Sequence, residues 1–241
     1  MSKNEQYISA LLGEGEKHFL SNISIDTVIL GYEENSLKVL LLRVTEGGWM
    51  LPGGYVFKNE SLDEAASRIL EERIALRDIF LKQFHVFGEP DRSFSSEIAA
   101  LFGKLGAPWT QNLWINQRFI SVGYYALVDI ARAAPRPNIF SKSCSWHPVE
   151  ALPALLLDHK EIIEKALHGF QNDLQNYPLG FHLLPSMFTM PELHGLFETV
   201  YRKSLDRSRF QKKMLSYGVF ERLEKKKGVA HRSPFLYRHR E

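Results

Sequence analysis

The sequence predicts an α+β fold in two parts, a larger domain over residues 1–178 and a smaller domain over residues 179–241. Strand-like runs of aliphatic residues and one amphipathic helical pattern occupy the first part. Two capped helices and two short strands follow one another in the second part. Charge divides the same way, since residues 202–241 carry 13 basic and 4 acidic side chains, a net charge of +9 that leaves −7 for residues 1–201.

Strands are expected where aliphatic and β-branched residues dominate, at residues 23–31 and 37–44. Glycines and a proline between positions 47 and 54 then indicate a loop. Two later runs, residues 84–88 and 119–130, also have strand character. The polar and aromatic insertion between these two runs, residues 93–117, is long enough to be a lid or a pocket wall.

A helix is predicted over residues 61–75, where apolar residues recur at helical spacing between charged residues. Residues 148–173 are interpreted as a helix or a helix pair. The looser stretch at residues 177–185 is the candidate junction between the two domains.

The C-terminal part begins with a capping box, in which the Thr189 hydroxyl accepts from the Glu192 amide and the Glu192 carboxylate reaches back. Asp206 is the expected N-cap of a second helix, whose inward side chains are predicted as Phe210, Met214 and Leu215. Strand-like runs at residues 219–223 and 235–237 follow, joined by a basic loop. Helix, turn, helix and hairpin together are the layout of a winged helix-turn-helix.

Composition restricts the class of protein. The single cysteine, Cys144, excludes an internal disulfide and fits a reducing cytoplasm. We find no signal peptide and no apolar run long enough to span a membrane, so a cytoplasmic protein without a membrane partner is expected. The histidines show no metal-ligand spacing, and no cofactor is predicted.

Residues 53–76 resemble the Nudix box. The positions that fall in register with the box are Gly54, Glu60, Arg68, Leu70, Glu72 and Leu76. Nudix hydrolases hold Mg²⁺ with helix glutamates spaced i, i+3 and i+4, which share one helical face.

Here those three positions are Ile69, Glu72 and Arg73. An aliphatic side chain cannot bind Mg²⁺ and a guanidinium repels it, so we predict no catalytic residue and no metal site. Glu72 is interpreted as a pocket or structural carboxylate and Arg68 as a structural tie to the glycine loop. Ala75 replaces the family glycine, and an altered turn after the helix is expected.

A binding pocket can persist after loss of catalysis. The candidate ligand contacts around the box are Arg43, Glu72, Arg73, Asp91, Arg92 and His159. Each is also compatible with an exposed surface position. The aromatic residues Trp109, Trp114, Tyr124 and Tyr125 are candidates for stacking on a sugar or base, although burial in the core is the commoner explanation.

The second C-terminal helix and the loop after it carry the basic residues expected to bind nucleic acid. Those on the helix are Arg207, Ser208, Arg209, Lys212 and Lys213, and those on the wing are Lys225, Lys226, Lys227, His231 and Arg232. Such a helix can enter the major groove, where Arg and Lys contact guanine edges and phosphates. A solvated charged face is the alternative, but the excess of +9 on this layout favours nucleic acid.

Nearly the whole sequence resembles the Nudix-related transcriptional regulators, the group of the NAD-biosynthesis repressor and the arabinose-utilisation regulator. The similarity extends beyond the degenerate box to residues 152–159, 180–189 and 205–213. It implies a Nudix-like α/β/α sandwich with a mixed sheet that senses an effector, followed by a winged helix on a double-stranded DNA operator. It also implies a homodimer.

The effector implied by the resemblance is a sugar or an ADP-ribose-like nucleotide sugar, and the sequence does not choose between them. An active Nudix hydrolase of ADP-ribose or a related nucleoside diphosphate derivative is the alternative function. A third hypothesis is a general RNA-binding protein. The sequence lacks the exposed aromatic platforms expected for binding single-stranded RNA.

Overall fold

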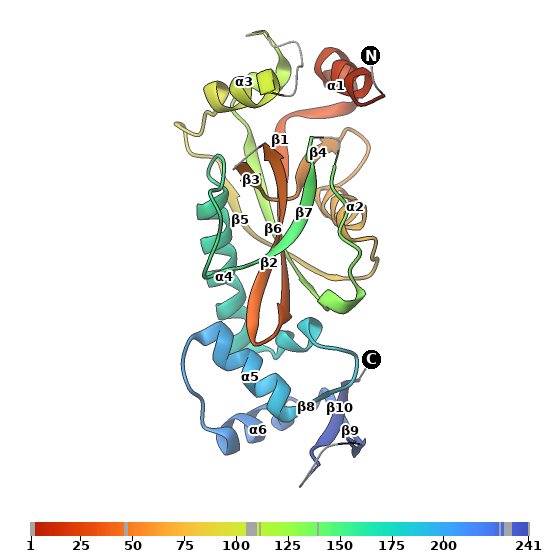
Figure 1. Cartoon of the computed structure of the whole chain (residues 1–241), viewed down its shortest axis with the longest axis vertical. Helices are drawn as coiled ribbons and strands as arrows, with labels where there is room; N and C mark the ends of the chain where they lie inside the picture. The colour runs from red at the N-terminus through yellow and green to blue at the C-terminus, as the bar shows by residue number, and fades with distance from the viewer. Residues whose placement is uncertain are drawn as a thin grey trace.

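The structure, a computed structural model, describes residues 3–45, 48–104, 110, 112–138, 140–226, 228 and 233–240. Figure 1 shows an elongated molecule with a large sheet in the middle. The C-terminal helices and a small sheet lie at one end, and the N-terminal helix lies at the other. The predicted α+β class is confirmed, with a mixed main sheet between helices.

In the described part of the chain, seven strands form the main sheet. Its central strand is β1, which pairs in parallel with β6 and antiparallel with β2 and β4. Strand β5 pairs with β6, and β3 and β7 both pair with β2. The strands are β1 (Phe19–Glu33), β2 (Ser36–Thr45), β3 (Gly48–Met50), β4 (Gly53–Phe57), β5 (Phe80–Phe87), β6 (Ile120–Val128) and β7 (Ser143–Pro148).

The strands predicted at residues 23–31 and 37–44 are confirmed, but β3 and β4 occupy a segment predicted as a loop, and β7 is not predicted at all. The glycine at position 53 explains the first difference. Gly53 lies opposite Asp26 of β1, and a Cβ there would come within 2.7 Å of the Ile25 carbonyl oxygen. The glycine therefore permits close strand packing rather than a turn.

Helices α2 (Leu62–Ile74) and α4 (His159–Asn176) cover opposite faces of the sheet. Alternate side chains of β1 meet each helix, because successive strand residues point to opposite faces. Ile25 packs in a cluster with Ile69 of α2, whereas Val28 packs in another with Ile162 of α4. This arrangement is the α/β/α sandwich that the resemblance implies.

Helix α2 begins and ends with capping residues. Ser61 and Glu64 form a reciprocal capping box at its start. At its end Ala75 adopts a left-handed conformation, φ 56° and ψ 32°, and its N–H donates to the Glu71 carbonyl oxygen. The helix thus keeps the left-handed ending that glycine favours, and the expectation of an altered turn is not met.

The prediction of helix from residue 148 onward is wrong for its first part. Helix α4 begins at His159 and continues to Asn176, while residues 149–158 contain no helix. Pro153 has no backbone N–H to donate, and this segment instead pairs with β3. The Trp49 N–H donates to the Ala154 carbonyl, and the Leu156 N–H donates to the Trp49 carbonyl. Tertiary pairing therefore overrides the helical spacing of the leucines.

The described part of the insertion at residues 93–117 contains two short helices. They are α3 (Ser95–Lys104) and the 3₁₀ helix η1 (Trp114–Asn116), and they pack against the N-terminal helix α1 (Lys3–His18) at one end of the molecule. Further 3₁₀ turns are η2 (Ile130–Arg132) and η3 (Leu179–Leu183).

The C-terminal unit is a winged helix. It contains β8 (Phe188–Thr189), α5 (Met190–Tyr201), α6 (Arg207–Ser216), β9 (Phe220–Lys225) and β10 (Phe235–His239), with the strands in the order β8-β10-β9. The predicted capping box is confirmed at Thr189 and Glu192, and Asp206 caps α6 through the Arg209 amide.

Leu215 does not face inward as predicted, since it is 43% exposed. Phe210 and Met214 lie four residues apart and are both buried. The next residue turns away by about 100° on a helix, which brings Leu215 to the surface. The prediction assigned one residue too many to the buried face of α6.

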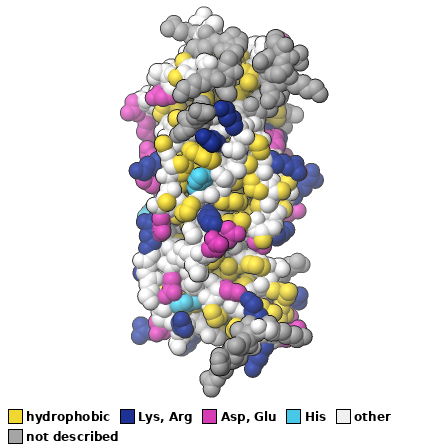
Figure 2. Space-filling view, viewed as in Figure 1, with side chains coloured by type: hydrophobic (Ala, Val, Ile, Leu, Met, Phe, Trp, Pro, Cys, Tyr) yellow, Lys and Arg dark blue, Asp and Glu magenta, His cyan; other side chains and the backbone are white. Residues whose placement is uncertain are grey.

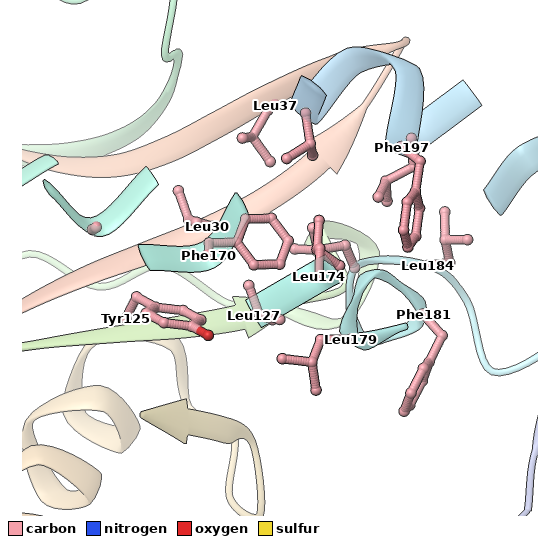
Figure 3. Close-up of a cluster of buried hydrophobic side chains, with 14 of the residues drawn as sticks. Leu30, Leu37, Tyr125, Leu127, Phe170, Leu174, Leu179, Phe181, Leu184 and Phe197 are labelled. Carbon is pink, nitrogen blue, oxygen red and sulfur yellow. The ribbon is translucent and has the colours of Figure 1, made fainter. Parts of the chain in front are cut away.

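One hydrophobic cluster joins the two predicted domains. Figure 3 shows Leu30 and Leu37 of the β1–β2 hairpin near Phe170 and Leu174 of α4, with Phe197 of α5 beside them. All of them are buried. The predicted boundary between residues 178 and 179 falls at the start of η3, and the core is continuous across it. None of the described helices combines the length and the apolar character that a membrane crossing requires.

Candidate functional site

A cavity of about 910 Å³ opens at one end of the main sheet, between α2 and the insertion. Its wall on the insertion side includes Glu97, Ile98 and Phe102 of α3. The prediction that this insertion forms a lid or a pocket wall is therefore confirmed as a wall. Asp26 of β1 and Tyr55 of β4 line the cavity from the sheet.

Four of the six predicted ligand contacts line this cavity, namely Glu72, Arg73, Arg92 and His159. Arg43 and Asp91 are exposed and lie outside it. Leu42 and Val44 point into the cavity, so Arg43 between them points to the other face of the sheet. Both residues remain candidates only for contacts at the surface.

Arg92 is held in a buried ion pair. Its Nε and Nη2 donate to the two carboxylate oxygens of Asp158 at 2.7 and 3.3 Å, and its Nη1 donates to the Phe119 carbonyl oxygen at 2.8 Å. The Arg92 side chain is only 9% exposed. With three such bonds, Arg92 fastens the insertion to the start of α4.

His159 follows Asp158 and is buried, with 2% of its surface exposed. Its Nδ1 accepts a hydrogen bond of 2.9 Å from the Leu51 amide, so the proton of the neutral ring resides on Nε2. Nε2 lies 3.6 Å from Oδ1 of Asp26. Burial lowers the pKa of His159, which keeps the ring neutral.

Asp26 is a cavity residue that the sequence analysis missed. The Ser121 hydroxyl donates to its Oδ2, and the Arg92 guanidinium lies 3.8 Å from the same oxygen. A lone carboxylate inside the apolar run of β1 was the available signal. Arg136 and Asn138 also line the cavity, from a segment between η2 and β7 that carries no recognisable motif.

The predicted aromatic contacts are explained by the core. Trp114, Tyr124 and Tyr125 are all buried. The hydroxyls of the two tyrosines donate to Asp63 and Asp173, so each ties β6 to a helix. Trp109 lies outside the described residues.

The predicted nucleic-acid residues of α6 form one exposed surface. Arg207, Ser208, Arg209, Lys212 and Lys213 are all exposed, and the buried Phe210 and Met214 face the other way. Lys213 differs from the others, because its Nζ donates to the Gln175 carbonyl oxygen at the end of α4, at 3.2 Å. Four of the five side chains are thus not engaged by α4.

The wing residues Lys225 and Lys226 lie at the end of β9. Lys226 forms an ion pair of 2.8 Å with Glu192 in the first turn of α5, and Lys225 Nζ lies 5.6 Å from the centre of the Phe235 ring. Figure 2 shows Lys and Arg side chains in dark blue at the lower end of the molecule, where Figure 1 places α6 and β9. The other predicted wing residues, Lys227, His231 and Arg232, lie outside the described residues.

Comparison with known families accounts for both parts of the chain. Residues 23–168 match the model of the NUDIX domain, and residues 180–239 match the model of the NrtR DNA-binding winged helix domain. The chain belongs to the Nudix family. The Nudix domain contains the cavity, and the winged helix contains α6.

A relative and two solved structures are similar over most of this Nudix protein. It is 24% identical over 224 residues to the ADPR responsive transcriptional repressor NtrR of Acinetobacter baylyi, across 90% of this chain and 81% of that protein. Shewanella oneidensis NrtR, crystallised with a 27mer DNA, has a TM-score of 0.71 at 23% identity over 90% of this chain and 93% of its own. A MutT/nudix family protein from Enterococcus faecalis has a TM-score of 0.67 at 22% identity, over 100% and 99% of the chains. The two structures establish a shared fold.

The residues of the Nudix helix α2 do not fit Mg²⁺. Ile69 is buried against Gly54, where a Cβ would lie 3.0 Å from Ile69 Cδ1. Glu72 accepts from Nη1 of Arg68 at 3.4 Å and from Nη2 of Arg73 at 3.1 Å. A carboxylate held by two guanidinium groups is a poor metal ligand. Among the described residues, no group of three or more His, Cys, Asp or Glu side chains is arranged to hold a metal ion.

Arg68 has the structural role predicted for it. Its Nε and Nη2 donate to the two oxygens of Glu60 at 3.0 and 2.6 Å, and Nη2 also donates to the Tyr55 carbonyl oxygen. These bonds hold the glycine-containing strand β4 against α2. The Glu60 partner raises the pKa of Arg68, and the bonds from Arg68 lower the pKa of Glu60 despite its partial burial.

Proposed function

We propose that this protein is a DNA-binding transcriptional regulator whose Nudix domain binds an ADP-ribose-like effector without hydrolysing it. The observation that carries the proposal is the exposed basic face of α6, in a winged helix joined to a Nudix domain whose described residues include no carboxylate set arranged to hold a metal ion. Both parts are needed, because the helix binds DNA and the cavity binds the effector that regulates this binding.

The DNA-binding half rests on the charge and shape of the C-terminal unit. Arg207, Arg209 and Lys212 project from a helix of 10 residues whose opposite side is buried. A helix of this kind fits the major groove, where Arg reads guanine edges and Lys contacts phosphates. The acidic remainder of the chain, with a net charge of −7, would be repelled by DNA, which orients the molecule with α6 toward it.

The effector half rests on the cavity. Its volume of about 910 Å³ lies within the range of small-molecule sites, roughly 300–1,000 Å³. Apolar and aromatic walls combine with arginines, which suits a ligand with a base, sugars and phosphates. The relative from Acinetobacter baylyi is described as ADPR responsive, and this supports a nucleotide sugar over a free sugar.

Loss of hydrolysis is supported by the Nudix helix. Ile69 and Arg73 replace two of the three metal-binding glutamates, and Glu72 is paired with arginines. We further propose that a homodimer presents two copies of α6 to the two half-sites of a palindromic operator.

The test combines selection of bound duplexes from a random DNA pool with an ADP-ribose hydrolysis assay on the same preparation in Mg²⁺. Enrichment of a palindrome without Mg²⁺-dependent turnover is the expected result. The selected duplex is then titrated with ADP-ribose, which should alter its affinity for the protein. Turnover together with a pool that stays random would establish a Nudix hydrolase instead.

A further inference from the structure

The metal-binding positions of the Nudix helix carry an altered charge. Three glutamates there would bring three negative charges, which must be neutralised by metal ions before an anionic diphosphate can approach. Ile69, Glu72 and Arg73 together are neutral. The electrostatic need for a metal ion is therefore absent at this wall of the cavity.

Arg73 occupies the last turn of α2 and lines the cavity. Its side chain is 11% exposed, and its Nη2 lies 3.1 Å from Oε2 of Glu72. A guanidinium held at a cavity wall has a fixed direction and several N–H donors. Such a group binds phosphate oxygens in a bidentate manner, which a point charge does not.

Arg136 reaches the same cavity from a distant part of the sequence. Its amide donates to the Arg73 carbonyl oxygen at 2.8 Å, and the Ala134 amide donates to the Ile74 carbonyl oxygen at 3.0 Å. These bonds satisfy carbonyl groups at the C-terminal end of α2. The end of a helix otherwise carries a partial negative charge that disfavours an anion. The segment therefore adds a positive charge to the cavity. It also weakens the repulsion between the C-terminal end of α2 and an anion.

We propose that Arg73 and Arg136 form a subsite that binds a diphosphate directly, with guanidinium groups in place of the metal ions of Nudix hydrolases. The identity of the full ligand, an ADP-ribose-like effector, rests on the proposed function. The subsite itself requires only a diphosphate, which separates the two claims.

Glu72 distinguishes this subsite from a metal site. In a metal site Glu72 is a ligand, and its removal weakens binding that depends on Mg²⁺. In the arginine subsite Glu72 competes with the diphosphate for Arg73, so its removal preserves or tightens binding. Its side chain is 48% exposed, so substitution by glutamine, which has the same shape, should leave the packing of α2 unchanged.

The experiment is calorimetric titration of the full chain with ADP-ribose and, separately, with inorganic diphosphate, each in EDTA and in Mg²⁺. The variants are Arg73→Ala, Arg136→Ala and Glu72→Gln. Arg77→Ala is the matched control, because Arg77 lies just beyond the end of α2, pairs with Glu71 at the surface and does not line the cavity. Thermal unfolding of each variant checks that it is folded.

Binding in EDTA equal to that in Mg²⁺ is expected. Arg73→Ala should weaken it about 10- to 100-fold, the range for a lost charge-assisted hydrogen bond, and Arg136→Ala should also weaken it. Glu72→Gln should bind at least as tightly as the native chain, and Arg77→Ala should match it.

Binding that requires Mg²⁺ and is lost in Glu72→Gln would overturn the subsite but leave the effector class standing. If ADP-ribose does not bind but inorganic diphosphate still binds through Arg73, the proposed effector class is overturned and the subsite stands. Failure of both ligands in EDTA would overturn the subsite.

Discussion

Single residues set the ends of the helices in this protein. Ala75 ends α2 and Arg202 ends α5, and both adopt left-handed backbone conformations with φ values of 56° and 51°. A Cβ makes this conformation unfavourable, by about 1–2 kcal/mol relative to glycine. In each helix this cost is offset by a hydrogen bond, because the N–H of the left-handed residue donates to a carbonyl of the last turn.

Ala75→Gly is predicted to stabilise the protein by about 0.5–1 kcal/mol, since relief of backbone strain exceeds the added entropy of the unfolded chain. The midpoint of urea unfolding measures it. The matched control is Ala100→Gly, an exposed residue inside α3, where the same change should destabilise by about 0.5–1 kcal/mol. Equal effects at both sites would refute the role of the backbone conformation.

At the scale of elements, η3 connects the Nudix domain to the winged helix through a series of ring contacts. His182 lies 5.0 Å from the Phe80 ring of β5 and 4.1 Å from Phe181, measured between ring centres. Phe181 in turn stacks on His239 of β10 at 4.1 Å. Burial, with a smaller contribution from His239, lowers the pKa of His182 to about 4.

The free energy of unfolding should therefore fall as pH decreases from about 6.5 to about 4. In this window the unfolded chain binds a proton at His182 and the folded chain does not, so stability rises with pH. Urea midpoints across the window measure the slope. His182→Gln and His182→Phe both remove the titrating group, and each should reduce the slope. If the slope is unchanged in both variants, groups other than His182 cause the pH dependence of the free energy of unfolding.

Helix α6 contains basic residues with different expected roles. Arg209→Ala should weaken binding to the selected operator by about 10-fold or more and binding to random duplex much less, if its guanidinium reads a base. Lys213→Ala should have a small effect on both, because Nζ of Lys213 is bonded to Gln175. Fluorescence anisotropy with both duplexes measures the ratio. Equal losses for Arg209→Ala on both duplexes would make Arg209 a phosphate contact.

Lys212→Ala is the companion measurement on the same helix. Its side chain is exposed, and we expect a phosphate contact that lowers the slope of log K against log salt by about 0.9. A slope identical to that of the native chain would remove Lys212 from the interface.

At the scale of the whole molecule, one shared core joins the Nudix domain to the winged helix. Leu37 at the tip of the β1–β2 hairpin and Leu174 of α4 pack with Leu193 and Phe197 of α5 in one cluster. Because this core continues across the predicted domain boundary, the two parts should unfold together.

Leu193→Ala removes a fully buried side chain from the winged helix and should destabilise the chain by about 2–5 kcal/mol. All four tryptophans precede residue 178, so their fluorescence reports the Nudix domain. We expect the fluorescence midpoint in urea to fall together with that of far-UV circular dichroism. Leu215→Ala, at an exposed leucine of the same unit, should change either midpoint little. A fluorescence midpoint that is unchanged in Leu193→Ala would show that the Nudix domain and the winged helix unfold independently.

The sequence by itself determined the features that depend on neighbours along the chain. The register of the Nudix box, the capping box at Thr189, the N-cap Asp206 and the basic C-terminal unit are all local patterns. The two helix caps are fixed by hydrogen bonds within one helical turn, and the box and the charge are read directly from residue spacing and composition.

Only the tertiary structure decided how the distant residues at the cavity are arranged, although Arg73, Arg92 and His159 were among the contacts predicted from the sequence. Asp26, Arg92, Asp158 and His159 meet because β1, the insertion and α4 converge at one end of the sheet, and Arg136 arrives beside Arg73 through a backbone bond. The same pairing of strands directs Arg43 away from the cavity. Spacing along the chain carries no information on such contacts, because strand pairing and burial bring together residues that are far apart in sequence.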